Sequence, residues 1–419
     1  MLIMLGRPRW TVGLAVAVLA MVSPAWAMQA ATDSAPTYES LIERLDAMPS
    51  TLEAQALSDA AQARAQQAAA LPNPTLSYDR ENFSGSGPYS GNRAAENTLA
   101  VNQPLELWGK RRARVQAAQA EALAADLRAG QQRWWSAGQL AQVYSAAEAS
   151  ERRYALATEA LSLIEQDAQA VAALVREGRE ATLRSVQAQS EVESARATLD
   201  EARAIRDAAF ARLSAWAMLP TPVATVGNSL LDREPKASLV QTNDPLSVQV
   251  AQAELEAASR LVTVEKRRAL PDVSAAVGLR RFEETGDDAM TAGITLTVPL
   301  FDRNRGGIRA AYADQRAAEA RLTAQKQAAY ADRLAAQATL EASNSRTRAA
   351  DSGVAAAEEA YRLSRVGFDA GRISQLELRS SRAALIAARN AAVDARQARV
   401  MAEIDLALLE GRAPFGETP

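Results

Sequence analysis

The stretch LPNPTLSYDRENF at 71–83, followed by LAVNQPLELWGKRRARVQAA at 99–118, recurs later in the chain as LPDVSAAVGLRRF at 270–282 and GITLTVPLFDRNRGGIRAA at 293–311. Each copy has a Leu-Pro start, an alternating segment, a polar loop, a second alternating segment ending in Pro-Leu, and a basic start to a long alanine-rich stretch. The offset between copies is 199 residues at the first prolines and 195 at the Pro-Leu pairs, so it shrinks only across loops. This pattern indicates a duplicated unit that contains a β-hairpin.

The N-terminus indicates where the chain works. Arg7 and Arg9 precede an apolar run at 10–22, and Ser-Pro-Ala-Trp-Ala at 23–27 supplies a small-x-small cleavage site. The run is shorter than the roughly 20 residues that a spanning helix needs. We therefore expect a removed signal peptide, 1–27, with an uncleaved anchor as the alternative.

The composition excludes several classes of function. The chain has no cysteine and no histidine, so it lacks disulfides, the commonest transition-metal ligands and the commonest general base. It has no Gly-rich phosphate loop or nucleophile motif. Its formal net charge of −3 argues against a nucleic-acid partner. We expect no enzyme activity, no cofactor and no metal site.

Two long windows are predicted to be helical. Proline is absent between Pro104 and Pro220 and between Pro299 and Pro414, and both windows are rich in strong helix formers. Apolar residues recur there at three- and four-residue steps. A solvated coiled coil would show the same periodicity, and only the hairpins argue against it.

A Gly-Arg pair interrupts each window at a matching place, Gly178-Arg179 and Gly371-Arg372. Glycine is the usual residue just past a helix C-terminus, where φ is positive. Thr182 or Ser374 could then cap the following helix. Each window is therefore predicted to be a helical hairpin with a tight turn at its far end.

The lengths define the organisation. Helices at 113–176 and 308–368 would be roughly 95 and 90 Å long. The return limbs, 182–216 and 373–409, are shorter, and the preceding helices supply the missing length. We expect a signal peptide (1–27), a first repeat (28–217; helix 38–70, strands about 72–107, helical hairpin 113–217), a connector (218–243), a second repeat (244–412; helix 245–268, strands about 271–301, helical hairpin 307–411) and a C-terminal tail (413–419).

The alternating segments fit the strands of a membrane barrel. Leu296 and Val298 alternate with Thr295 and Thr297, which gives one apolar face and one polar face. Such a strand suits lipid outside and a wet lumen inside. Four strands per chain cannot enclose an aqueous lumen, so several copies must share one barrel.

The duplication, the Pro-Leu strand ends and the glycine tips together resemble the TolC-like outer-membrane factors, over about residues 38–411. The stretches ENFSGSG at 81–87 and QPLELWGKRR at 103–112 look more specifically like the cobalt-zinc-cadmium (CzcC-type) branch. The resemblance implies a mainly α channel-tunnel, a homotrimer that shares a twelve-stranded barrel in the outer membrane and extends into the periplasm. It also implies two partners, a periplasmic adaptor and an inner-membrane pump of the resistance-nodulation-division type.

The resemblance also suggests functional residues. Family members carry acids after the second tip that surround the periplasmic aperture. Glu377 occupies the first acidic position, whereas the second is Ser380. Arg184 is the equivalent of Glu377 in the first hairpin and would pair with it, line the lumen or simply be solvated. Arg379 is a further candidate to compensate the charge of Glu377.

Two other groups are candidates. Gly178, Arg179, Gly371, Arg372 and Ser374 mark the tips where an adaptor would make contact. Trp108 and Phe301 would lie at the membrane interface, beside basic residues that follow the strands. The alternative for these basic residues is that they only keep the helix starts soluble.

The expected function, from the resemblance to the CzcC-type branch, is a conduit for heavy-metal cations. The conduit would be passive, because the chain has no nucleotide motif of its own. Three alternatives remain. A periplasmic adaptor normally has one helical hairpin in a β-rich chain, a filament-like coiled coil would lack the strand pairs, and the same channel fold could serve drug efflux or type I secretion.

Overall fold

A computed structural model describes residues 36–220, 222–227, 230–234, 244–412 and 414–415. The predicted signal peptide and most of the C-terminal tail lie outside these ranges. The helices are α1 (Tyr38–Ile42), α2 (Pro49–Ala69), α3 (Lys110–Arg176), α4 (Thr182–Trp216), α5 (Leu246–Arg268), α6 (Arg305–Asp369) and α7 (Gln375–Leu409). The strands are β1 (Thr75–Glu81), β2 (Glu96–Leu105), β3 (Asp272–Phe282) and β4 (Asp288–Thr297), and two short 3-10 helices are η1 (Leu45–Ala47) and η2 (Gly87–Tyr89).

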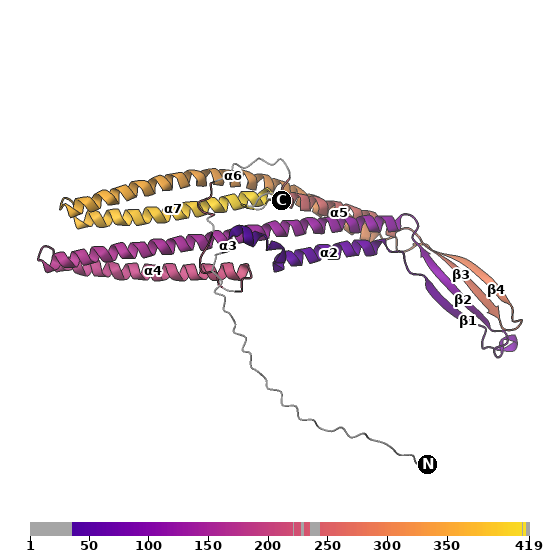
Figure 1. Cartoon of the computed structure of the whole chain (residues 1–419). Coiled ribbons are helices and arrows are strands. Elements are labelled where there is room, and N and C mark those ends of the chain that lie inside the picture. Colours follow the sequence, from indigo (N-terminus) through magenta and orange to yellow (C-terminus); the bar gives the residue numbers. More distant parts are fainter. Residues whose placement is uncertain (1–35, 221, 228–229, 235–243, 413, 416–419) are drawn as a thin grey trace, which may run out of the picture. The chain divides into compact units, whose positions relative to one another are not determined.

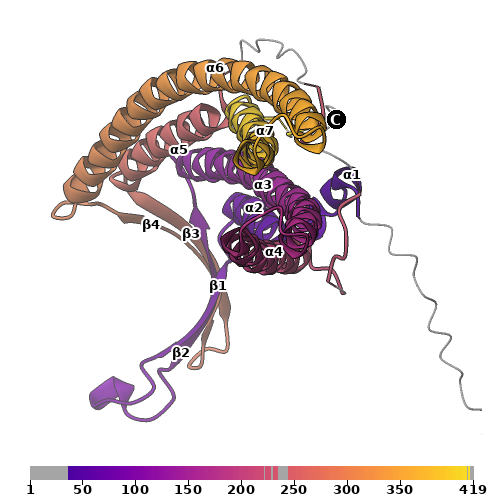
Figure 2. The same cartoon turned by 90° about the vertical axis from the view of Figure 1, so that its left-hand side faces the viewer.

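The helices form two full-length rods, α3 and α6, each accompanied by shorter helices placed end to end (Figures 1 and 2). The α3 helix packs against α2 and α4 and also against α5 and α7, while α6 packs against α5 and α7. Most of the buried side chains of α3 are alanines. Because alanine side chains are small, the helices can pack against one another along α3 without large apolar residues between them.

The lead-in helix differs from the prediction. A single helix was expected at 38–70, but the structure breaks it into α1, η1 and α2. The Thr37 side chain caps α1 by accepting from the Ser40 N–H at 3.2 Å, and Pro49 begins α2. Proline suits a first helical position because its missing N–H is not needed there. The break lets Leu41, Leu45 and Met48 enter the core.

The main apolar core lies midway along α3. It joins α1, the C-terminal ends of α4 and α7, and the connector residues Leu230 and Leu231 to Leu140 and Tyr144 of α3. The two ends of the described chain meet at this core, because the Tyr38 hydroxyl donates to the Pro414 carbonyl at 2.7 Å. Burial raises the pKa of Tyr38, so the hydroxyl stays protonated.

The four strands form one antiparallel sheet in the order β1-β2-β3-β4. The central pair, β2 and β3, joins the first repeat to the second. Neither β1 nor β4 has a second strand partner among the residues that the structure describes. The sheet therefore presents two open edges, which a monomer normally covers or protects.

The register sorts the side chains by polarity. Tyr78, Leu99, Leu279 and Met290 form one row across all four strands. Further rows, apolar except for Gln103, repeat two residues apart: Leu76, Val101, Val277 and Ala292; Gln103, Ala275 and Ile294; Leu105, Val273 and Leu296. The opposite face carries small and polar residues such as Ser77, Thr98, Ser274 and Thr295. Leu296 lies on the apolar face as predicted, whereas Val298 lies beyond the end of β4.

No helix within the described ranges combines the length and apolarity required to span a membrane.

Candidate functional site

The two helical tips have the same backbone geometry. Gly178 and Gly371 have φ of 71° and 69°, so the predicted positive φ is confirmed at both positions. The N–H of Arg179 bonds to the Leu174 carbonyl at 2.9 Å, and that of Arg372 bonds to the Gly367 carbonyl at 2.8 Å. The glycine N–H groups bond to carbonyls three residues back, at 3.1 Å for Gly178 and 2.8 Å for Gly371, and the two bonds together are the Schellman arrangement that ends a helix. The duplication therefore extends to individual hydrogen bonds.

Alanine at either tip glycine should destabilise the turn by about 1 kcal/mol, because a β-carbon is strained at positive φ. Space is not the cause, since a β-carbon at Gly178 or Gly371 would meet no atom within 4 Å. Gly353→Ala is the matched control: Gly353 is also uncrowded but lies within α6, where alanine should stabilise by up to about 1 kcal/mol. Chemical denaturation of the three variants measures both signs. Equal stability of all three would refute the strain argument.

Glu377 caps its own helix. Its carboxylate accepts from the Ser374 N–H at 2.7 Å, and the Ser374 hydroxyl accepts from the Glu377 N–H at 3.3 Å. The predicted cap at Ser374 is thus confirmed. The corresponding cap predicted at Thr182 in the first hairpin is wrong, because α4 begins there after Ala181 and has no side-chain cap.

The predicted pair between Arg184 and Glu377 does not form within the described chain. Arg184 instead donates to Gln187 at 3.4 Å on its own helix. Arg379 does not compensate Glu377 either, since it forms an ion pair with Glu191 of α4. Both differences have one cause, because the capping geometry directs the Glu377 carboxylate back towards Ser374. The aperture role of Glu377, Arg184 and Arg379 in an assembly stays a prediction.

A different cluster ties the second hairpin to the first. Arg382 of α7 is 5% exposed and forms ion pairs with Asp167 of α3 and, at 3.1 Å, with Glu191 of α4. A buried guanidinium needs such partners, because an unpaired buried charge is costly. The sequence analysis missed this cluster.

Arg382 begins a regular series, Arg382, Arg389 and Arg396, which we call the α7 arginine row. Arg389 joins Glu159 of α3, at 2.7 Å, to Glu358 of α6, at 2.9 Å. Arg396 joins Asp351 of α6, at 2.9 Å, to Asp232 of the connector, at 3.1 Å. The seven-residue spacing was visible in the sequence and places all three side chains on one face of a helix. This spacing, which the sequence analysis did not use, is the signal that could have shown that the helix packs through a row of charged side chains instead of apolar ones.

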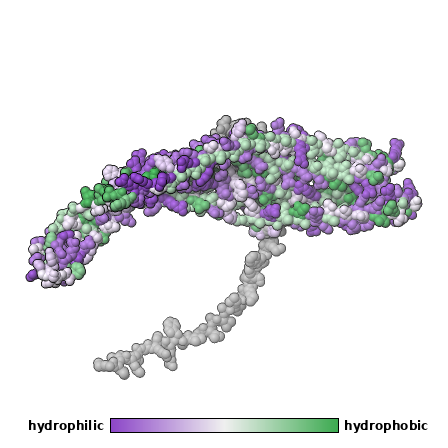
Figure 3. All heavy atoms as spheres, turned by 180° about the vertical axis from the view of Figure 1, so that it is seen from behind, coloured by the Kyte–Doolittle hydropathy of each residue, from purple (hydrophilic) through white to green (hydrophobic). Residues whose placement is uncertain are grey.

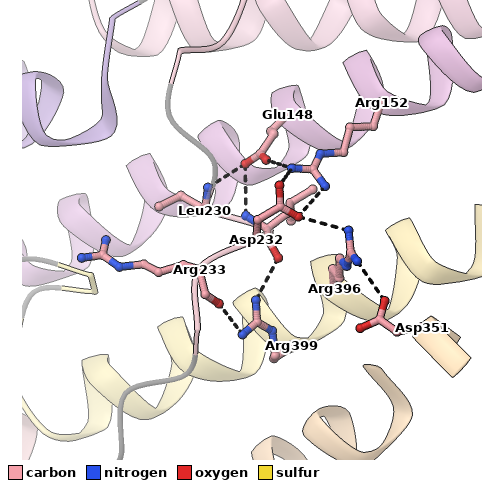
Figure 4. A network of polar contacts seen from close by, with 9 residues as sticks. Glu148, Arg152, Leu230, Asp232, Arg233, Asp351, Arg396 and Arg399 are labelled. Carbon is pink, nitrogen blue, oxygen red and sulfur yellow. Dashed lines mark hydrogen bonds and ion pairs between the residues drawn. The ribbon is translucent and has the colours of Figure 1, made fainter. Parts of the chain in front are cut away.

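The connector is held by buried polar groups (Figure 4). The Glu148 carboxylate of α3, which is 5% exposed, accepts from the N–H groups of Leu230 and Leu231 at 2.8 and 3.2 Å. Arg152 binds Glu148 at 2.7 Å and Asp232 at 2.5 Å. The connector is therefore attached to the first repeat by its backbone as well as by its side chains.

Arg399 of α7 attaches the same segment to the second repeat. It is 4% exposed and donates to the carbonyls of Leu231, at 2.9 Å, and Arg233, at 2.6 Å (Figure 4). Its neighbour Glu403 lies 3.5 Å away. Burial raises the pKa of Glu403, against the lowering effect of nearby arginines. The connector thus bridges the two hairpins at the level of the apolar core.

The aromatic candidates lie where the sheet meets the helices. Trp108 is half exposed, and its indole N–H donates to the Pro271 carbonyl at 3.1 Å, at the start of β3. Phe301 is fully exposed just after β4. Neither position tests the predicted membrane role. In the sequence, Trp108 comes shortly after the end of β2 and Phe301 shortly after the end of β4.

Comparison with known proteins identifies the architecture. The family model described as "Outer membrane efflux protein" matches residues 43–217 and 238–412, which correspond to the two repeats. The match favours the channel over the adaptor and filament alternatives.

Two curated relatives come from metal-resistance systems. The chain is 38% identical to the nickel-cobalt-cadmium resistance protein NccC of Alcaligenes xylosoxydans xylosoxydans over 69% of this chain and 66% of that protein, slightly less than two thirds of its length. It is 28% identical to the cobalt-zinc-cadmium resistance protein CzcC of Cupriavidus metallidurans over 87% of this chain and 90% of that protein. The predicted CzcC-type branch is supported by these matches.

Among solved structures, the open state of the Neisseria gonorrhoeae MtrE outer membrane channel is similar, with a TM-score of 0.76. The sequence identity is 20%, and the match covers 90% of this chain and 89% of that one. At this identity the similarity shows the fold, which is the predicted channel-tunnel with two repeats.

Proposed function

Because this chain belongs to the outer membrane efflux protein family, we propose that three copies of it form a passive conduit that carries heavy-metal cations across the outer membrane. The observation that carries the proposal is the four-stranded sheet, which has one apolar face, one polar face and two open edges. Three such sheets, joined β4 to β1, would close a twelve-stranded barrel. Closure would satisfy both edges and give a polar lumen.

The orientation of the sheet predicts how substitutions on its two faces differ. Ile294→Arg, in the middle of the apolar face, should destabilise the assembly by about 2–4 kcal/mol because the charge would enter lipid. The adjacent Thr295→Arg should be tolerated and should alter conductance, because that side chain faces the lumen. Urea titration of both variants in vesicles measures the difference. Equal destabilisation would mean that the faces are assigned wrongly.

The tips are the proposed contact with a periplasmic adaptor. Both carry an exposed arginine, Arg179 or Arg372, directly after the glycine. Leu183 and Leu376 occupy equivalent positions in the two tips and are 64% and 62% exposed. An apolar patch with a polar rim marks an interaction surface, and these leucines would supply the apolar part of such a patch when the tips assemble. Equivalent features in both hairpins would let three chains present six similar contacts.

The energy for export would come from a partner, an inner-membrane pump of the resistance-nodulation-division type, and the chain itself would not act as an enzyme. Among the described residues, no group of three or more His, Cys, Asp or Glu side chains lies close enough to hold a metal ion. The cations would therefore pass without being coordinated, and the choice of metal would be made by the pump. The names of the relatives favour nickel, cobalt, zinc and cadmium.

Deleting the gene tests this proposal. We expect lower tolerance to these four metals, restored by the wild-type gene and not by one that encodes Ile294→Arg. Tolerance to organic drugs should be unchanged. A loss of drug tolerance alone would assign the channel to drug efflux instead, and no change under any condition would contradict both functions.

A further inference from the structure

Four helix ends are fastened together at the base of the sheet. The Lys110 ammonium at the start of α3 donates to the Leu270 carbonyl after α5 and binds Asp272, both at 2.7 Å. The Arg114 side chain donates to the Ala68 carbonyl at the end of α2 at 2.9 Å. Asn304, before α6, donates to the Glu265 carboxylate of α5 at 2.6 Å. These contacts place the ends of α2 and α5 and the starts of α3 and α6 at one level.

Five other arginines at this level are not used in these contacts. All five are exposed, and no hydrogen bond or ion pair joins their side chains to any other residue in the described ranges. We call them the basic collar, and they are Arg112, Arg267, Arg303, Arg305 and Arg309.

The two collar arginines at helix starts do not help their helices to form, whereas Arg267 lies in the last turn of α5, where positive charge is favourable. Arg112 and Arg305 lie in the first turns of α3 and α6, and neither first turn contains an acid. Positive charge at a helix N-terminus is unfavourable, because the N-terminus already carries partial positive charge. Solubility alone would be served as well by acidic residues there. The arrangement calls for anions supplied from outside the chain.

The surroundings indicate the source of these anions. Immediately beside the collar lie the base of the apolar sheet face and the exposed aromatic residues Trp108 and Phe301. Figure 3 shows hydrophobic residues of the sheet followed directly by hydrophilic residues on the adjoining helix ends. An apolar band bordered by aromatic and basic residues is the pattern found at the level of lipid headgroups.

We propose that the basic collar binds the phosphate groups of anionic phospholipids in the membrane leaflet that faces the helices. This inference rests on the proposed outer-membrane function and adds a lipid partner to it. Guanidinium groups match phosphate oxygens by paired hydrogen bonds, and arginines near an anionic membrane surface attract its lipids. In a trimer the collar would present fifteen such groups in a ring, since each copy supplies five. The lipid ring would fix the height of the channel in the membrane.

The test uses the full trimer in phosphatidylcholine vesicles that contain spin-labelled phosphatidylglycerol or spin-labelled phosphatidylcholine. The test variant combines Arg303→Gln, Arg305→Gln and Arg309→Gln. The matched control combines Arg316→Gln, Arg321→Gln and Arg346→Gln, which removes the same charge from exposed positions further along α6. The readout is the ratio of bound phosphatidylglycerol to bound phosphatidylcholine.

We expect the wild type and the control to prefer phosphatidylglycerol. In the test variant the ratio of bound phosphatidylglycerol to bound phosphatidylcholine should be about threefold lower. High salt should weaken the preference, because it screens exposed charges. Equal preference in both variants would overturn the proposal. So would displacement of the lipid by inorganic phosphate, which would indicate a site for soluble anions.

Conductance in planar bilayers separates this inference from the function on which it rests. Both variants should conduct like the wild type in phosphatidylcholine bilayers, because the proposal places the collar against lipid and outside the lumen. A wild type that did not conduct would count against the channel itself, whatever the lipid measurements gave.

Discussion

Arg382→Leu is expected to release the second helical hairpin from the first. Removing the guanidinium leaves Asp167 without a cation and Glu191 with Arg379 alone, and breaking a buried ion pair in this way costs about 3–5 kcal/mol. We expect about 3 kcal/mol, because the two carboxylate side chains are both 27% exposed and water can partly solvate them. Amide hydrogen exchange in the first half of α7 should then be about a hundredfold faster.

The matched control is Arg389→Leu. Arg389 belongs to the same α7 arginine row and also bridges two acids, but Glu159 and Glu358 are 51% and 48% exposed. Exposed pairs contribute only about 0–1 kcal/mol each. Exchange in this variant should change by less than about tenfold. If the two variants behaved alike, burial would not be what makes the Arg382 cluster hold the hairpins together.

Glu148→Ala is expected to detach the connector. The substitution leaves the buried N–H groups of Leu230 and Leu231 without their acceptor, and each unsatisfied group costs about 1–3 kcal/mol. Alanine keeps α3 intact, because it is the strongest helix former. Trypsin should therefore cleave after Arg233 at least about thirtyfold faster than in the wild type, which corresponds to about 2 kcal/mol of local opening.

Glu151→Ala provides the comparison. Glu151 lies on the same helix and, in the described part of the connector, accepts from one N–H, that of Val226, at 3.2 Å. Its loss should cost about 1 kcal/mol and accelerate cleavage by no more than about tenfold. Unchanged cleavage in Glu148→Ala would mean that Arg399 and the apolar core hold the connector without it.

The sequence was sufficient for the elements whose determinants are local or repeated. Proline-free windows predicted the long helices, the Gly-Arg pairs predicted the tips, and alternation predicted the two faces of the sheet. The repeated offset predicted that the two halves contain equivalent elements. The break in the lead-in helix was missed because the prediction of one helix at 38–70 did not consider Pro49, and proline favours a helix start.

Site residues that depend on tertiary partners could not be predicted in the same way. Glu377 was chosen by family resemblance, but the nearer competitor for its carboxylate is the N–H of Ser374, three residues away. Arg382 and Glu148 attracted no attention because a charge on an alanine-rich helix normally faces water. Their burial depends on α3, α4, α7 and the connector meeting at particular levels, which is set by the assembled helices.

The most direct test of the channel is made possible by the absence of cysteine, because any cysteine introduced is then the only thiol in the chain. Single variants Thr291→Cys, Ala292→Cys, Gly293→Cys, Ile294→Cys and Thr295→Cys scan successive positions of β4. The measurement is the rate at which a charged, membrane-impermeant maleimide labels each variant in outer-membrane vesicles. The account predicts fast labelling at 291, 293 and 295, which face water, and slow labelling at 292 and 294, which face lipid. Uniform labelling along the strand would contradict a barrel with a wet lumen and a lipid-facing wall.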